Sequence, residues 1–164
     1  MTAIAECKVP EGSLLSAYAG GEAYTDCYSV DVSMPVIQAQ FVEAFYTTPL
    51  FKVERFLLRL ASRPSTDVAA KELALGQAET FAMWRVENRK ETELLLAAGR
   101  TRSWLMAKSG AGQDSNGTRL YFGSAIVPNH KGQLGFGVTT LQGFHKLYSR
   151  ALLHAARLRL ERAK

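Results

Sequence analysis

Hydrophobic and polar residues alternate with a period of two over residues 24–32, and this alternation predicts a strand with one mainly apolar face. Residues 1–23 lack such a period and are rich in Gly, Ser and Ala. We therefore interpret them as an N-terminal arm laid over the surface of a single domain that spans residues 24–164. The segment Ser33-Met34-Pro35 ends the strand and opens a helical pattern.

Three helices are predicted after this strand. Apolar residues recur at helical spacing over residues 35–47. Thr48-Pro49 has the pattern of an N-cap followed by proline at the first helical position, and it begins a second helix that ends before Arg63-Pro64. Ser65 is predicted to cap a third, shorter helix that Gly76 closes.

The pattern then changes to apolar-rich runs of strand length, separated by short turn-like segments. These runs are residues 79–87, 92–98, 101–109 and 118–127. Short connections favour antiparallel neighbours, because a parallel pair needs a crossover of about a dozen residues. The region is therefore predicted to form an antiparallel meander, which gives five strands when residues 24–32 are included.

Alternation within the runs predicts which side chains face the core. The more apolar sets, expected to face it together, are Thr92/Leu94/Leu96, Trp104/Met106 and Leu120/Phe122/Ser124/Ile126. The run 79–87 has apolar residues on both faces, with Trp84 and Arg85 on opposite sides, so its inward face stays open.

A glycine-spaced connector after Pro128 leads to a final helix of about twenty residues or more, which ends near Arg162. Its predicted apolar face consists of Leu141, Phe144, Tyr148, Ala151, Leu152, Ala155 and Leu158. The residues predicted to point away from that face are Lys146, Ser149, Arg150, Arg157 and Glu161.

This order of elements, with one long C-terminal helix after the meander, is that of the helix-grip fold, an α+β architecture. Three strings carry the resemblance: YTDCYSV at residues 24–30, ETELLL at 91–96 and FHKLY at 144–148. The chain resembles the START-like (SRPBCC) superfamily over about residues 24–160, and more closely a bacterial domain-of-unknown-function family placed near it. It departs from the larger START-like domains, which have seven strands.

The resemblance implies a hydrophobic pocket between a curved sheet and the final helix, used for lipids, polyketides or similar apolar ligands, and it transfers no catalytic residue. The candidate ligand-binding residues are Tyr28, Trp84, Arg85, Trp104, Met106, Phe122, Phe144, His145 and Tyr148. Arg85 would anchor a ligand carboxylate if it points inward. The large side chains could instead simply fill the core.

Three functions stay open at this stage. The first is a module that binds a small apolar molecule in this pocket. The second is an enzyme of the same fold, of the cyclase, hydratase or hydrolase type, that uses His145 with Tyr148 or an inward Arg85. The third is an interaction protein whose basic final helix engages a partner protein, anionic lipid or nucleic acid.

Other chemistry is disfavoured by the motifs. The sequence contains no nucleotide-binding fingerprint, no Walker A string and no G-x-S-x-G elbow. Cys7 and Cys27 form no Cys-x-x-Cys and have no nearby His, so they are predicted to be reduced thiols, and no metal or other cofactor is expected. The charged residues interpreted as the solvated rim of a turn are Arg85, Glu87, Arg89, Lys90, Glu91 and Glu93.

The formal net charge of +5 is concentrated at the C-terminus: residues 1–142 contain fourteen basic and fourteen acidic residues, and the last 22 contain six basic and one acidic. Because cations in the last helical turn also offset the helix dipole, nucleic acid is disfavoured as a partner. The sequence shows neither a secretory signal nor a transmembrane-length apolar run, so a cytoplasmic location is expected. The ligand and the formation of a homodimer stay open.

Overall fold

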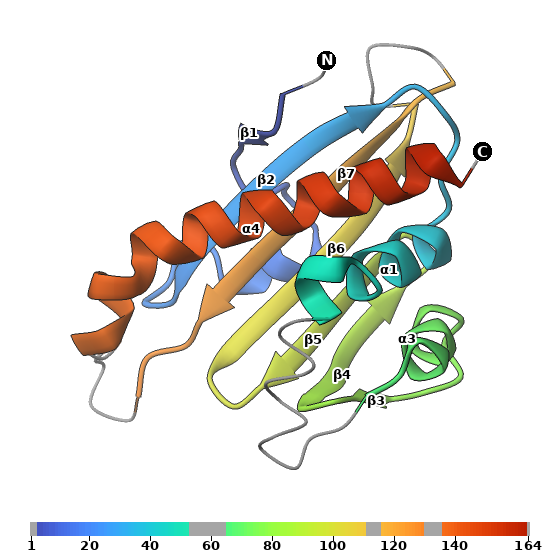
Figure 1. Cartoon of the computed structure of the whole chain (residues 1–164). Coiled ribbons are helices and arrows are strands. Elements are labelled where there is room, and N and C mark those ends of the chain that lie inside the picture. Colours follow the sequence, from blue (N-terminus) through green and yellow to red (C-terminus); the bar gives the residue numbers. More distant parts are fainter. Residues whose placement is uncertain (1–2, 53–64, 111–115, 130–135, 164) are drawn as a thin grey trace.

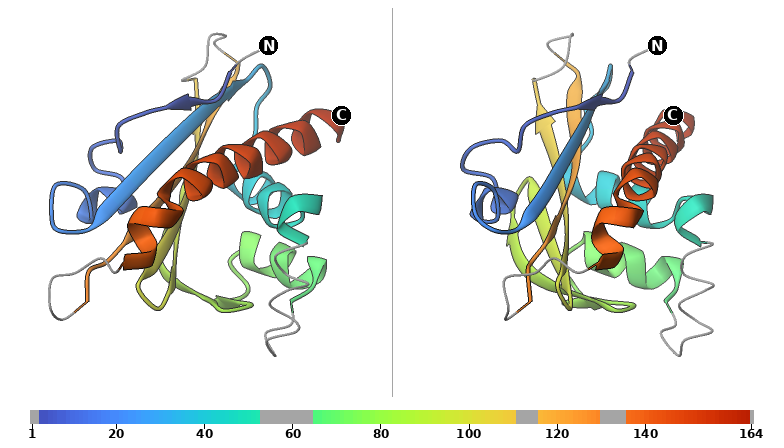
Figure 2. Two further views of the ribbon diagram at one scale, coloured as in Figure 1. Left: turned by 60° about the vertical axis from the view of Figure 1, so that its left-hand side comes forward. Right: turned by 90° about the vertical axis from the view of Figure 1, so that its left-hand side faces the viewer.

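A computed structural model describes residues 3–52, 65–110, 116–129 and 136–163, without the side chains of residues 136–144. The described residues form an α+β fold: one antiparallel sheet with helices on one face and the N-terminal arm on the other (Figure 1; Figure 2). The predicted α+β class, the antiparallel meander and the long C-terminal helix are confirmed.

The sheet formed by the described residues has seven strands in the order β1-β2-β7-β6-β5-β4-β3 (Figure 1). The strands are β1 Ala5–Glu6, β2 Tyr24–Val32, β3 Thr80–Phe81, β4 Trp84–Lys90, β5 Glu93–Ala98, β6 Thr101–Ser109 and β7 Thr118–Ile126. All neighbouring strands are antiparallel. The five predicted strands are present, and the two-residue strands β1 and β3 are added at the two edges.

The predicted strand over residues 79–87 is wrong in its bounds. Phe81 pairs with Trp84 across a two-residue turn that begins at Ala82, whose φ is +53°. Because neither Gly nor Asn marks this turn, the composition gave no sign of it. β4 then continues to Lys90, so polar residues 88–90 belong to a strand and not to the predicted turn.

Three helices have described bounds: α1 Gln38–Tyr46, α3 Asp67–Ala74 and α4 Phe136–Arg162. They cover one face of the sheet, whereas the arm, with its 3-10 turn η1 (Leu14–Ala17), covers the other (Figure 2). Most of the predicted second helix, residues 53–64, lies outside the described residues.

Threonines cap two of the helices. The Oγ1 of Thr48 accepts a hydrogen bond from the Phe51 N–H at 3.1 Å, which confirms the predicted cap before Pro49. The cap of α3 is Thr66, whose Oγ1 accepts a hydrogen bond from Ala69 N–H at 3.0 Å, so the prediction of Ser65 is wrong by one residue.

The buried face of α4 is rotated from the predicted one. Ser149 and Arg157, predicted to point away from the sheet, are only 0% and 6% exposed, whereas Ala151 is exposed. Apolar residues that are buried on α4 include Leu152, Leu153, Ala156 and Leu160. Two neighbouring stripes of this helix are apolar, so helical spacing alone could not decide which one packs on the sheet.

The larger hydrophobic core lies between the sheet and the helices. Around α1 it is filled by the rings of Phe41, Phe45, Tyr46, Phe51, Phe81 and Phe122, whose neighbouring centroids lie 4.8–6.4 Å apart. This part of the interface is therefore closely packed.

A smaller core lies on the opposite face, under the N-terminal arm. It consists of Leu14, Leu15, Cys27, Leu95, Trp104, Met106 and Ala125. The prediction that Trp104 and Met106 face the same core as Phe122 is therefore wrong. Because the arm buries the second face of the sheet, β6 is apolar on both faces and its alternation does not show which face meets the helices.

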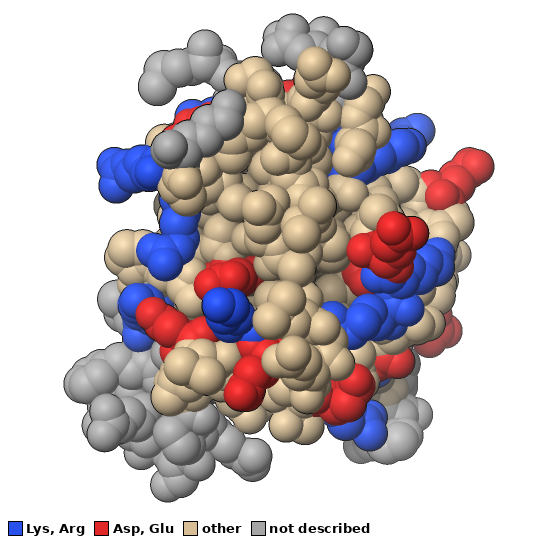
Figure 3. Space-filling view, turned by 90° about the vertical axis from the view of Figure 1, so that its right-hand side faces the viewer, with Lys and Arg blue, Asp and Glu red and all other residues tan. Residues whose placement is uncertain are grey.

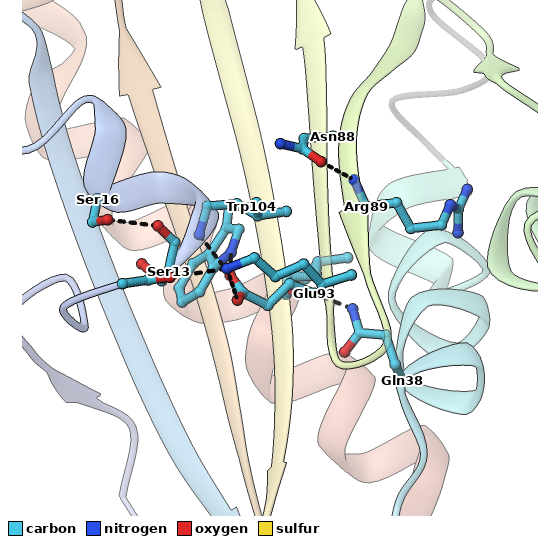
Figure 4. Close-up of polar contacts among 11 residues, drawn as sticks. Ser13, Ser16, Gln38, Asn88, Arg89, Glu93 and Trp104 are labelled. Carbon is cyan, nitrogen blue, oxygen red and sulfur yellow. Dashed lines mark hydrogen bonds and ion pairs between the residues drawn. The ribbon is translucent and has the colours of Figure 1, made fainter.

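Glu93 fastens the arm over this smaller core (Figure 4). Its buried carboxylate accepts hydrogen bonds from Leu14 N–H at 2.7 Å and Trp104 Nε1 at 2.8 Å. Lys90 Nζ lies 3.3 Å from the same carboxylate and donates to the Gly12 carbonyl at 2.9 Å. These contacts compensate a buried charge, so the interpretation of Glu93 as part of a solvated rim is wrong.

Candidate functional site

The candidate site lies between β2 and α4, where polar side chains enter the larger core. Asp26 and Ser124 are directly opposite each other in the pairing of β2 with β7. Asp26 is 5% exposed, and its Oδ1 accepts hydrogen bonds from Ser124 N–H at 3.1 Å and from Ser124 Oγ at 2.5 Å. These two hydrogen bonds fix the orientation of the carboxylate.

His145 reaches this pair from α4. Its Nε2 lies 2.8 Å from Ser124 Oγ and 3.5 Å from Asp26 Oδ2. Ser124 has a single hydroxyl proton, and the contact with the ionised Asp26 takes it, so His145 Nε2 carries the hydrogen that points at Ser124. The His145 side chain is 31% exposed, so it borders both the buried carboxylate and solvent.

Several buried polar atoms in the same region have no hydrogen-bond partner within the described part of the chain. They are the hydroxyls of Tyr24, Tyr28 and Ser149, and Asp26 Oδ2. Tyr24, Asp26 and Tyr28 alternate along β2 and share one face, and Ser149 follows His145 by one helical turn. We call Tyr24, Asp26, Tyr28, Ser124, His145 and Ser149 the β2–α4 cluster.

Burial and the nearby carboxylate suppress the ionisation of both tyrosines. Burial first, and then the charge of Asp26, raises the pKa of Tyr24 to about 12. The same two causes raise the pKa of Tyr28 above its ordinary value. Both phenols therefore keep their protons at neutral pH and can donate hydrogen bonds.

The geometry of the β2–α4 cluster favours binding over nucleophilic attack by Ser124. In a serine–histidine–carboxylate triad, the serine and the carboxylate contact opposite nitrogens of the imidazole ring. Here Ser124 and Asp26 both face Nε2 of His145, and Ser124 donates to the carboxylate. The atoms of the cluster that have no partner among the described residues are hydroxyl donors and one carboxylate acceptor. Such groups can form hydrogen bonds with a molecule bound between α4 and the sheet.

The structure brings five of the predicted ligand-binding residues to this face of the sheet. Tyr28 lies opposite Phe122 in the β2–β7 pairing, His145 contacts the cluster, and Tyr148 packs on the same core. Trp84 packs against this core from β4, towards the far edge of the sheet.

The other predicted site residues do not join them. Trp104 and Met106 lie in the smaller core under the arm. Arg85 is exposed, so the condition for its role as a carboxylate anchor is not met. The side chain of Phe144 lies outside the described residues.

Sequence reasoning missed Tyr24, Asp26, Ser124 and Ser149 as site residues. Asp26 carried a usable signal, because it occupies an inward position of an alternating strand and a carboxylate is rarely buried there without a partner. Ser124 likewise lies in the inward set of β7. Ser149 gave no signal, because the predicted face of α4 was out of phase.

A separate open groove of about 350 Å³ lies at the other end of α4, beside the start of α1. Its lining residues are Met34, Pro35, Val36, Gln40, Glu43, Ala44, Arg159, Leu160 and Ala163. None of these belongs to the β2–α4 cluster, so this groove is distinct from the candidate site.

Comparisons of the chain with protein-family models, curated proteins and solved structures give no match. Among the described helices, none combines the length and apolar character that crossing a membrane requires. The described His, Cys, Asp and Glu residues form no group of three or more that could hold a metal ion. The site is therefore interpreted from its own geometry.

Proposed function

We propose that the protein is a binding module of the helix-grip type, which holds a small, mainly apolar molecule between the sheet and α4. The order of elements and the packing of α4 across β2 and β7 support this fold (Figure 1). Edge strands β1 and β3 bring the strand count to that of the larger START-like domains, which strengthens the resemblance to the superfamily.

The observation that carries the proposal is a row of buried polar atoms in the β2–α4 cluster that have no hydrogen-bond partner among the described residues. One of them, Asp26 Oδ2, has His145 Nε2 at 3.5 Å. A buried polar group without a partner costs about 1–3 kcal/mol, so a core that simply excluded water would favour apolar side chains at these positions. The aromatic rings around α1 fill the other end of the core. The ligand is therefore proposed to lie near His145, with its polar group at the cluster.

The charges define the class of ligand. Asp26 Oδ2 is a buried acceptor, so the polar group of the ligand is proposed to be a hydrogen-bond donor, such as a hydroxyl or an amine. A carboxylate would meet the charge of Asp26 at short range. The nearby bases do not offset this, because Lys146 Nζ contacts Glu6 Oε1 at 3.2 Å and Arg150 Nη2 donates to the Ile4 carbonyl at 3.2 Å.

Native mass spectrometry of the protein purified from cells tests the proposal. We expect a co-purifying apolar hydroxyl or amine compound, and the same compound can then be titrated into stripped protein. Tyr28→Phe removes only a hydroxyl and should weaken its binding about three- to tenfold, the equivalent of one neutral hydrogen bond. Tyr121→Phe is the matched control, because Tyr121 packs beside Trp104 on the opposite face.

Two results would contradict the proposal. One is a protein that carries no small molecule and takes up none from a panel of apolar alcohols and amines. The other is equal loss of binding in Tyr28→Phe and Tyr121→Phe, because that would place the bound molecule away from the β2–α4 cluster.

An enzyme of the same fold is a second candidate, because His145 is partly exposed and has Ser124 within hydrogen-bond distance. In this case His145 would exchange a proton with the bound molecule, and Ser124 and Asp26 would orient the ring. Incubating the co-purified molecule with the protein and with His145→Gln distinguishes the two functions. Conversion by the unaltered protein alone supports catalysis, and unchanged recovery from both supports binding alone.

A further inference from the structure

The two cysteines of the chain, 20 residues apart in sequence, meet at an edge of the sheet. Cys7 directly follows β1 and Cys27 belongs to β2. The Cys7 N–H donates a hydrogen bond to the Cys27 carbonyl at 2.9 Å, and the two Sγ atoms lie 3.2 Å apart. Both are free thiols, placed side by side by the pairing of the arm with the sheet.

The two thiols have different surroundings. Cys27 is 1% exposed and belongs to the smaller core, whereas Cys7 is partly exposed at its border. Contact with the Cys27 thiol, which can donate to a Cys7 thiolate, lowers the pKa of Cys7 to about 7. The same contact, and then burial, raises the pKa of Cys27. Cys7 is therefore the thiol that solvent reaches and that ionises first.

We propose that Cys7 and Cys27 form a peroxide-reactive dithiol, which closes to a disulfide and fastens the N-terminal arm to β2. The inference is independent of the proposed ligand-binding function. It rests on the placement of an accessible and a buried thiol in direct contact across two strands.

The reaction has two balanced steps, with hydrogen peroxide as the oxidant. The Cys7 thiolate attacks one peroxide oxygen, the O–O bond breaks, and the leaving hydroxide takes a proton to become water, which leaves Cys7 as a sulfenic acid. The Cys27 sulfur then attacks the Cys7 sulfur, and the sulfenic hydroxyl leaves with the Cys27 proton as a second water. Two thiols lose two electrons in total, and the peroxide gains them.

The geometry suits the second step. A disulfide bond is about 2.05 Å long, so the sulfurs must approach by about 1 Å. β1 pairs with β2 through Ala5 and Glu6, and Cys7 adds one backbone hydrogen bond beyond them, so a shift of about 1 Å at the sulfurs disturbs few backbone contacts. The bond would then make that short pairing covalent and retain the arm over Trp104 and its neighbours.

Counting thiols by mass spectrometry tests this inference, since Cys7 and Cys27 are the only cysteines in the sequence. The reduced protein is treated with hydrogen peroxide, denatured and alkylated with N-ethylmaleimide. We expect a protein that is lighter by two hydrogens, takes up no N-ethylmaleimide and regains both thiols on treatment with dithiothreitol. The rate of loss should rise with pH through about 7, as Cys7 ionises.

Two single variants identify the attacking thiol and show whether the surrounding fold matters. In Cys27→Ser, Cys7 should stop at the sulfenic acid and be trapped by dimedone. In Cys7→Ser, the buried Cys27 should remain unmodified in the folded protein. The inference is overturned if both thiols of the original chain survive peroxide, or if the disulfide links two chains instead of forming within one. It is also overturned if Cys27 in Cys7→Ser reacts as fast as Cys7 in Cys27→Ser.

Discussion

The two oxygens of the Asp26 carboxylate have different surroundings, and this difference determines what the β2–α4 cluster can bind. Oδ1 accepts two hydrogen bonds from Ser124, whereas Oδ2 is buried without a hydrogen-bond partner in the described residues. A single carboxylate thus fixes its own orientation with one oxygen and offers the other as an acceptor. Its charge also acts on the neighbouring phenols of β2.

The ionisation of Tyr24 is the first prediction at the residue scale. Its pKa of about 12, against an ordinary value of about 10, means that the folded state disfavours the phenolate. This contribution to stability is therefore complete below about pH 10 and is lost as the pH rises towards about 12. In a tyrosinate absorbance titration, the difference between the original protein and Tyr24→Phe should be a transition near pH 12.

Asp26→Asn provides the control for this titration. Without the carboxylate charge, the Tyr24 transition should move towards about pH 10 but stay above it, because burial is the larger cause of the shift. A Tyr24 transition at about pH 10 in the original protein, the ordinary value for a solvated tyrosine, would contradict the described geometry.

Sequence patterns placed some residues of the site correctly and could not place others. Helical spacing placed His145 at the border of the apolar face, and alternation placed Tyr28 and Phe122 on one side of the sheet, where the structure has them. Trp104 could not be placed, because β6 is buried on both faces and alternation requires one face to be solvated. The contact of Ser124 with Asp26 depends on strand register, which no local pattern specifies.

At the scale of elements, the smaller core depends on how closely η1 approaches β7. A Cβ atom on Gly123 would lie 2.5 Å from Leu15 Cδ2, 2.9 Å from the Asp26 carbonyl oxygen and 3.1 Å from Trp104 Cε3. We expect Gly123→Ala to destabilise the protein by about 1–3 kcal/mol, because strand backbone cannot move aside as a flexible side chain can. Urea denaturation measures this change in the free energy of unfolding.

Gly21→Ala is the matched control for this substitution. An added Cβ atom there has no neighbour within 4 Å, so the free energy of unfolding should change by less than about 0.5 kcal/mol. Equal stability of Gly123→Ala and the original protein would show that the arm does not pack on β7 as described.

Elements with a strong local signal were predicted well, and those that depend on partners were not. β2, β5, β6 and β7 lie within about two residues of their predicted bounds, because turn residues and alternation mark them. β1 and β3 are two residues long and exist only because a neighbouring strand pairs with them. The phase of α4 was missed for a similar reason: tertiary packing, and not the spacing of its apolar residues, selects the stripe that is buried.

For the whole molecule, the basic C-terminal segment has a structural role in addition to its charge. Lys146 and Arg150 of α4 contact Glu6 and Ile4 at the edge strand of the arm. Arg157 is buried and lies 3.5 Å from Glu161. On the face shown in Figure 3, basic and acidic side chains are intermixed. This distribution favours contacts within the molecule over a single basic docking surface.

The last prediction separates these two roles by paired substitutions on α4. Lys146→Gln with Arg150→Gln should loosen the arm, because each surface contact contributes up to about 1 kcal/mol. Cleavage after the exposed Lys8 by a lysine-specific protease should therefore become about two- to tenfold faster. The mass of the released N-terminal peptide identifies this cleavage. Arg159→Gln with Arg162→Gln removes the same charge from exposed positions of α4 and should leave this rate unchanged.

The same two double variants test an interaction role for α4. If α4 docked on anionic lipid through its exposed bases, the original protein would sediment with phosphatidylserine vesicles. Arg159→Gln with Arg162→Gln would then abolish sedimentation without changing the rate of cleavage after Lys8. We expect no sedimentation at physiological salt, because α4 packs its apolar side on the sheet and two of its bases contact the arm. Equal cleavage of both double variants would contradict the assignment of Lys146 and Arg150 to the arm.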